Sequence, residues 1–139
     1  MSFRSEKKFI LNPNNLIYFY KWIEKNECKK IYEKRLVNSL YFDNKNNQMY
    51  HDSDEGVLPR KKIRIRNYNN NTNIYLLEKK ISSMEGRFKT SIQKKKIIDF
   101  ENYGIFDAQY GLCKPILQVK YLRQYFLFNK YRITFDQKI

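Results

Sequence analysis

Several short segments of the sequence carry Lys and Arg at every second position. The clearest is Lys62-Ile63-Arg64-Ile65-Arg66, in which basic side chains alternate with isoleucines. Alternate side chains of a β-strand point to opposite faces, so the basic residues share one face and the isoleucines the other. The planar fork of arginine suits bidentate hydrogen bonding to phosphate oxygens. The segment therefore predicts a strand that holds an anion on one face and packs a core on the other.

Three further segments show the same spacing with a carboxylate mixed in. The residues that share a strand face in each segment are Arg4, Glu6 and Lys8; Glu78 and Lys80; and Arg132, Thr134 and Asp136. An antiparallel sheet with one face in water also carries polar residues at such positions. The recurrence of arginine at strand centres favours an anion-binding face, on which carboxylates moderate repulsion or hold a divalent metal.

The whole chain is strongly basic. It has 28 Lys and Arg against 14 Asp and Glu, a formal net charge of +14. Charge of this size destabilises a compact state unless anions offset it. Hydrophobic residues make up 42% of the chain, which excludes a disordered protein. Composition alone leaves polyphosphate, nucleotides, RNA, DNA and anionic membranes open as partners.

Cysteine and histidine are too scarce for many kinds of site. Cys28 and Cys113 lie far apart and His51 is the single histidine, so a Cys/His zinc site and most catalytic triads are excluded. The polar run around His51 predicts a solvated loop. The charged N-terminus has no apolar stretch typical of a leader, and the cysteines form no evident pair, so we expect a cytoplasmic protein.

The pattern of elements predicts an α+β fold dominated by antiparallel strands, in a single domain over residues 1–139. A helix is expected from Pro13 to Asn26, with Asn12 as its N-cap and an apolar stripe facing the core. A second helix is expected near residues 94–101. The asparagines of residues 69–73 suit a hairpin turn. The expected strands cover residues 3–11, 37–43, 61–68, 74–81, 115–126 and 131–135.

The order of these motifs along the chain is informative. They are Arg4-x-Glu6-x-Lys8, Ser39-Leu40-Tyr41-Phe42-Asp43, Arg60-x-Lys62-x-Arg64-x-Arg66-x-Tyr68, Leu77-Glu78-x-Lys80, Arg87-Phe88-Lys89, Val119-x-Tyr121-x-Arg123 and Arg132-Ile133-Thr134-x-Asp136. This succession resembles the VTC-type polyphosphate polymerase domain, a branch of the triphosphate tunnel metalloenzymes that also includes the CYTH proteins.

The resemblance implies an antiparallel barrel of about eight strands around a tunnel lined by Lys, Arg and Glu. It implies Mn²⁺ or Mg²⁺ as cofactor, ATP or polyphosphate as ligand, and transfer of the γ-phosphoryl of ATP to a polyphosphate chain. Glu6 and Glu78 would be acidic lining residues or metal ligands, and Lys62 and Asp136 are further candidates. The implied phosphate contacts are Lys8, Arg64, Arg66, Lys80, Lys89, Arg123 and Arg132.

Two departures from the family pattern shape these expectations. Arg4 stands where CYTH proteins have the first Glu of Glu-x-Glu-x-Lys, which favours the polymerase-like branch. Family members continue with strands that carry a Glu metal ligand, which is expected beyond Ile139. We therefore expect an incomplete tunnel, completed in one hypothesis by self-association, that binds polyphosphate but turns over ATP poorly.

Three hypotheses follow for function. The first is a polyphosphate polymerase-like enzyme, and the second is a non-catalytic binder of polyphosphate or nucleotides. The third is a nucleic-acid-binding module that stacks bases on its aromatic residues. The sequence has no RRM signature and no helix-turn-helix pattern, so we expect nucleic acid to bind only as a nonspecific polyanion.

Overall fold

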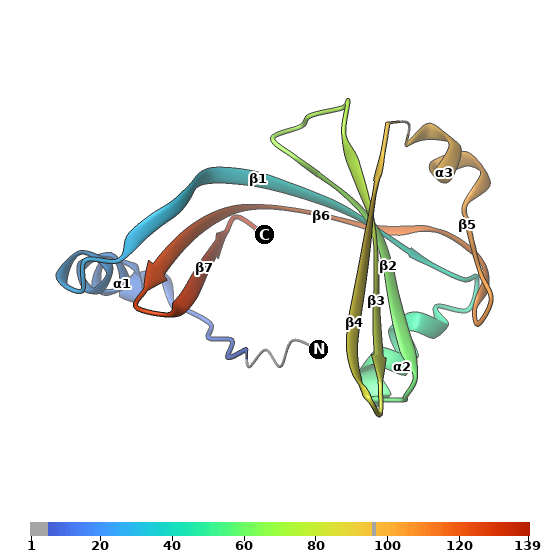
Figure 1. The fold of residues 1–139 in the computed structure, drawn as a ribbon, viewed down its shortest axis with the longest axis horizontal. Coiled ribbons are helices and arrows are strands. Elements are labelled where there is room, and N and C mark those ends of the chain that lie inside the picture. The colour runs from blue at the N-terminus through green and yellow to red at the C-terminus, as the bar shows by residue number, and fades with distance from the viewer. Residues whose placement is uncertain (1–5, 96) are drawn as a thin grey trace. The chain divides into compact units, whose positions relative to one another are not determined.

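A computed structural model describes residues 6–95 and 97–139 of the chain. The described elements are η1 (Pro13–Asn15), α1 (Leu16–Lys25), β1 (Lys29–Asp43), α2 (Gln48–Glu55), β2 (Arg60–Tyr68), β3 (Tyr75–Ser83), β4 (Gly86–Lys94), α3 (Ile98–Tyr103), β5 (Ile105–Asp107), β6 (Gly111–Phe128) and β7 (Tyr131–Gln137). The strands form one sheet in the order β4-β3-β2-β1-β6-β5, and β7 pairs with β6 (Figure 1). The predicted α+β class with a predominance of antiparallel strands is confirmed.

Contacts within the chain divide it into two compact units, which are described separately. The first holds the described residues up to Lys34 together with Arg123–Asp136, and the second holds Arg35–Leu122 and Gln137–Ile139. The backbones of β1 and β6 each pass from one unit into the other. A single domain over residues 1–139 stays a prediction.

The first unit contains the predicted N-terminal helix. It begins as the 3-10 turn η1 and continues as α1. Asn12 is the N-cap of η1, as predicted, and its side-chain oxygen accepts a hydrogen bond from the backbone N–H of Asn14 at 3.2 Å. This bond satisfies one of the amide groups that a helix start leaves without a partner.

The apolar stripe of α1 packs within the first unit. The ring of Phe19 lies 4.7 Å from that of Phe135, and the Trp22 ring lies 5.2 Å from that of Phe128, measured between centroids. Ile23 is buried. The amphipathic pattern thus correctly indicated a helix that covers aromatic residues of β6 and β7.

The strand expected over residues 3–11 is wrong in its described part. Residues 6–11 form neither helix nor strand, and the side chains of Glu6 and Lys8 are exposed. Residues 3–5, with Arg4, lie outside the described residues. Alternation fixes only which side chains would share a face, whereas a strand also needs a partner strand for its hydrogen bonds.

In the second unit β2, β3 and β4 run side by side as an antiparallel meander (Figure 1). The predicted hairpin between β2 and β3 is confirmed. Its turn places Asn69 and Asn70 in left-handed backbone conformations, with φ of 51° and 55°. Asparagine tolerates this region better than most residues, which is why the asparagine run marks the turn.

Several elements of the second unit differ from the sequence-based expectation, and the short strand β5 was not predicted. β4 was not predicted, and it is an exposed edge strand with few apolar residues to reveal its period. α3 starts at Ile98, later than the helix expected near residues 94–101. α2 was not predicted either, and it places His51 on a helix, exposed but not in a loop. The carboxylate of Asp43 accepts hydrogen bonds from the α2 amides of Met49 and Tyr50, both at 2.9 Å.

The hydrophobic core of the second unit lies on one face of the sheet. Gly104, which ends α3, has a φ of +79°, and a Cβ there would lie 2.5 Å from the carbonyl oxygen of Cys113, so only glycine fits this position. The cluster of buried core residues is Phe42, Met49, Ile63, Ile65, Tyr75, Leu77, Ile105, Tyr110 and Cys113.

Candidate anion-binding face

Strand pairing in the second unit places rows of polar side chains on the face opposite the core. Residues directly opposite each other on paired strands share a face. The first row is Ser39, Arg66, Leu76 and Gln93; the second is Tyr41, Arg64, Glu78 and Ser91; the third is Lys62, Lys80 and Lys89. We call this surface the cationic face. The predicted shared face of Lys62, Arg64 and Arg66, with Ile63 and Ile65 in the core, is confirmed.

Glu78 lies at the centre of the cationic face and is only 2% exposed. Its Oε2 accepts a hydrogen bond from Nε of Arg64 at 2.6 Å and lies 3.9 Å from Nη1 of Arg66, while its Oε1 forms an ion pair with Nζ of Lys89. Burial by itself would raise the pKa of Glu78, but the Lys89 hydrogen bond and the Arg64 charge bring that pKa below its usual value. Glu78 is therefore ionised at neutral pH.

Side chains of β1 and β6 orient the two arginines. Nη1 of Arg64 donates to the phenol oxygen of Tyr41 at 3.0 Å, and Nε of Arg66 donates to Oγ of Ser39 at 3.0 Å. Nη2 of Arg66 also donates to the phenol oxygen of Tyr121 at 3.4 Å. Burial lowers the pKa of Arg64, but Tyr41 and Glu78 outweigh it and raise that pKa overall. Both guanidinium groups are thus fixed before any ligand arrives.

The predicted site residues did not include Ser39, Tyr41 or Tyr121. Ser39 and Tyr41 are two residues apart on one strand, as Arg64 and Arg66 are on the next. The shared spacing could have signalled that they face the arginines, but only the register shows which residue meets which.

The third row holds like charges directly opposite one another. The register pairs Lys62 with Lys80 and Lys80 with Lys89 across β2, β3 and β4. Lys80 is exposed, yet the partial burial of its side chain, followed by the charge of Arg64, lowers its pKa. Like charges at opposite positions destabilise a sheet, so the row of three lysines leaves an excess of positive charge on this face.

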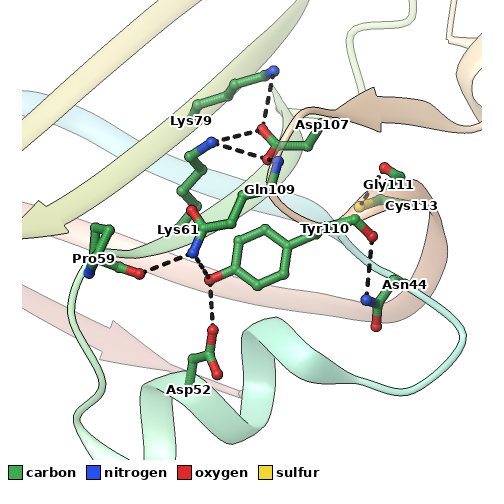
Figure 2. A network of polar contacts seen from close by, with 10 residues as sticks. All are labelled: Asn44, Asp52, Pro59, Lys61, Lys79, Asp107, Gln109, Tyr110, Gly111 and Cys113. Atoms are coloured by element: carbon green, nitrogen blue, oxygen red, sulfur yellow. Dashed lines mark hydrogen bonds and ion pairs between the residues drawn. The ribbon is translucent and has the colours of Figure 1, made fainter.

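A second polar cluster lies on the opposite face of the same strands (Figure 2). The Asp107 carboxylate, in a residue only 4% exposed, accepts hydrogen bonds from Nζ of Lys61 at 2.9 and 3.2 Å and forms an ion pair with Nζ of Lys79 at 3.8 Å. Burial alone would raise the pKa of Asp107, but the Lys61 hydrogen bond and the backbone N–H of Gln109 lower it overall. We call this set the Asp107 cluster.

Tyr110 extends the Asp107 cluster to α2. Its phenol donates to Oδ2 of Asp52 at 2.7 Å and accepts from Nε2 of Gln109 at 3.2 Å (Figure 2). Burial, and then the hydrogen bond to Asp52, raise the pKa of Tyr110 to about 12. This cluster ties α2 and the β5–β6 hairpin to the sheet and was not foreseen from the sequence.

The structure therefore brings together six of the predicted site residues in the second unit, and five lie in the first. The first group is Lys62, Arg64, Arg66, Glu78, Lys80 and Lys89. In the first unit Arg123 donates from Nε and Nη2 to the two carboxylate oxygens of Asp136, at 2.6 and 2.7 Å, while Arg132, Lys8 and Glu6 are exposed. Their assignments as lining residues stay predictions.

The described residues do not fit the metal that the family resemblance implies. Tunnel enzymes of this kind generally use a divalent cation, which needs several oxygen ligands. No group of three or more His, Cys, Asp or Glu side chains that could hold a metal occurs in residues 6–95 and 97–139. Both oxygens of Glu78 already contact cations. The donor set on the cationic face therefore fits an anion and not Mn²⁺ or Mg²⁺.

Comparison with known proteins gives a family and a fold. A model of the VTC domain matches residues 3–139. No curated protein matches the chain. The fold is similar to the X-ray structure of a Vibrio parahaemolyticus protein assigned as an adenylate cyclase, with a TM-score of 0.54 and 17% identity. The likeness covers 91% of this chain and 63% of that one, so this chain spans less than two thirds of its structural relative.

None of the helices in the described residues has the length and apolar character needed to cross a membrane. The expected cytoplasmic location stays a prediction.

Proposed function

Because the chain belongs to the VTC domain family, we propose that its cationic face binds a chain of phosphates, either the triphosphate of ATP or polyphosphate. The observation that carries this proposal is the row of Lys62, Lys80 and Lys89, in register across three strands beside the half-buried Arg64 and the buried Arg66. One carboxylate in these rows, Glu78, offsets only part of that charge.

The arrangement suits phosphates better than a diffuse anionic surface would. Arg64 and Arg66 are held by the hydrogen bonds that they donate to Tyr41 and Ser39, so they lose little conformational freedom when a ligand binds. Lys62 and Lys80 are exposed and can move toward successive phosphate groups. Fixed guanidinium groups with mobile ammonium groups beside them favour a ligand with several adjacent negative charges.

The finer proposal is phosphoryl transfer from ATP to the end of a polyphosphate chain. Such a transfer depends on in-line positioning and on charge neutralisation more than on a covalent nucleophile. In this proposal Arg64 and Arg66 orient the donor phosphates, and the lysine row offsets charge that develops on the transferred group. Lys8, Arg123 and Arg132 are proposed as additional phosphate contacts on the family resemblance alone.

A non-catalytic role in binding polyphosphate or nucleotides is the second candidate. It is favoured by the cations that occupy both oxygens of Glu78, because this leaves the carboxylate of the cationic face without a free oxygen for a metal. Nucleic acid would compete only as a nonspecific polyanion, since the proposed contacts recognise phosphate and no base. Self-association to complete a barrel belongs to this proposal as well.

The test uses Lys80→Met and Lys79→Met, neighbouring residues of β3 on opposite faces. Each variant loses one positive charge, but only Lys80 lies on the cationic face. We expect Lys80→Met to weaken tripolyphosphate binding about tenfold and Lys79→Met less than about twofold, since charge-assisted hydrogen bonds contribute ~1.5–3 kcal/mol. Isothermal titration calorimetry without metal measures both affinities. Equal losses of affinity in the two variants would show that binding depends on net charge alone and not on the cationic face.

Activity is measured separately on the unaltered chain. Incubation with ATP and Mn²⁺, followed by analysis of phosphate chain length, distinguishes synthesis from binding. Polymer growth supports the enzyme, and tight tripolyphosphate binding without polymer growth supports the binding module. If the unaltered chain binds no tripolyphosphate, both candidate functions are contradicted.

A further inference from the structure

We propose that Glu78 is an internal counter-ion that holds Arg64 and Arg66 in place while no polyanion is bound, and that it is not a metal ligand. This inference rests on the proposed binding of phosphate chains by the cationic face. It assigns Glu78 as a positioning residue that acts through the arginines, in place of the metal-binding role that the family resemblance suggests for an acidic lining residue.

The first support is the position of Glu78 in the sheet. The register places it directly opposite Arg64 on one side and Ser91 on the other, within the second row of the cationic face. It is 2% exposed, and three basic side chains surround it. A buried carboxylate is stable only when it is paired and hydrogen-bonded, and here the pairing comes from the residues proposed to bind the ligand.

The second support is that both carboxylate oxygens are occupied. Oε2 accepts from Arg64 Nε at 2.6 Å, and Oε1 faces Nζ of Lys89. A divalent cation bound to either oxygen would lie about 2.0–2.2 Å from it and would have to displace a cationic partner. It would also remain close to Arg66, whose Nη1 is 3.9 Å from Oε2. Repulsion of this kind opposes metal binding in the absence of a ligand.

The third support is the charge that remains. Lys62, Lys80 and Lys89 with the two arginines outnumber the single carboxylate in the same rows. Glu78 therefore reduces repulsion among the cations without neutralising the face. A bound phosphate chain would meet the same cations and would be repelled by the carboxylate beside them. Glu78 should then stabilise the empty protein and weaken the binding of the anion.

The experiment compares Glu78→Gln with a matched control, Glu85→Gln. Both lose one negative charge from the β3–β4 hairpin, but Glu85 is exposed in the turn between the strands. For Glu78→Gln we expect a lower melting temperature in chloride, a larger rise with tripolyphosphate at matched ionic strength, and about tenfold tighter metal-free binding of tripolyphosphate. Glu85→Gln should match the unaltered chain in all three measurements within about twofold in affinity.

Addition of Mn²⁺ separates the two roles of Glu78. If Mn²⁺ strengthens tripolyphosphate binding to the unaltered chain, the counter-ion role predicts the same strengthening in Glu78→Gln. Loss of that strengthening in Glu78→Gln, or weaker metal-free binding by the folded variant, would overturn the inference. No tripolyphosphate binding by the unaltered chain would refute the proposed function instead, and the lower melting temperature of Glu78→Gln in chloride would still test the counter-ion role.

A second variant covers the case in which Glu78→Gln does not fold. Lys89 lies on the edge strand with its side chain 48% exposed, so Lys89→Met should fold. It frees Oε1 of Glu78 from its ammonium partner. Electron spin resonance of Mn²⁺ should show no bound metal in Lys89→Met without an anion, because Arg64 and Arg66 remain beside the carboxylate. Mn²⁺ that binds to Lys89→Met but not to the unaltered chain would overturn the inference.

Discussion

The two faces of the β2–β3 hairpin each hold a nearly buried carboxylate between cations, yet they differ in charge. On one face Asp107 meets Lys61 and Lys79, and a backbone amide completes its hydrogen bonds. On the other Glu78 meets Arg64, Arg66 and Lys89, with Lys62 and Lys80 in the next row. The Asp107 cluster joins separate segments of chain, whereas the Glu78 cluster joins side chains of adjacent strands.

The difference is the one expected between a structural ion cluster and the proposed binding surface. A cluster that serves the fold needs its charges paired within the protein, because uncompensated buried charge costs stability. A surface that serves a ligand retains an excess of one sign, which the ligand then offsets. Changes to the Asp107 cluster should therefore alter stability alone, and changes to the cationic face should alter ligand binding as well.

The largest effect is expected for Asp107→Asn. The substitution leaves Lys61 and Lys79 without their carboxylate, and it should lower the free energy of unfolding by ~3 kcal/mol. Asp54→Asn, at an exposed position of α2, should change it by less than about 0.5 kcal/mol. Denaturant unfolding measures both. Tripolyphosphate should stabilise Asp107→Asn no more than the unaltered chain. If it stabilised Asp107→Asn more, the Asp107 cluster would also affect ligand binding, and the distinction between the two faces would be wrong.

A smaller effect is expected for Tyr110→Phe, which removes the hydrogen bond to Asp52. At pH 8 it should cost ~1 kcal/mol of unfolding free energy, while tripolyphosphate affinity stays the same. The pKa of Tyr110 is raised to about 12, so the folded state retains its proton when the unfolded state has lost it. Stability of the unaltered chain should thus fall as the pH rises from about 10 toward 12.

Tyr110→Phe should lack this part of the alkaline loss. Tyr103→Phe, at a residue that is 76% exposed, is the control and should follow the unaltered chain. Identical slopes of unfolding free energy against pH in all three proteins would show that the Tyr110 phenol is not held in its neutral form by the fold.

The smallest effect concerns the pH dependence of binding through Lys80. Partial burial and the Arg64 charge lower the pKa of Lys80 in the free protein, and bound phosphates should raise it again. Affinity for tripolyphosphate should therefore be full below the free-state pKa and fall a few-fold as the pH rises through it. Lys80→Arg keeps its charge and should remove this decline. Calorimetry in buffers of different ionisation enthalpy should also detect proton uptake by the unaltered chain.

Features set by neighbouring residues were predictable from the sequence. Alternation over Lys62–Arg66 gave the correct faces, because strand parity is a local property of the backbone. Asn12 and Pro13 gave the correct start of the first helix, and the asparagines at 69 and 70 gave the turn. The succession of motifs pointed to the family that the domain model also matches.

Features set by pairing between distant segments required the tertiary structure. β4 and α2 have too little apolar periodicity to be recognised from the sequence. β4 depends on pairing with β3, and the Met49 and Tyr50 amides of α2 donate to the Asp43 carboxylate. Parity fixes which face a side chain occupies, but only the register places Glu78 beside Arg64 and aligns Lys62, Lys80 and Lys89. The ion pair between Lys61 of β2 and Asp107 of β5 depends on how the later part of the chain folds back against the earlier strands. The sequence by itself thus determined the chemistry of the cationic face, and the long-range strand pairing decided which charges compensate each other.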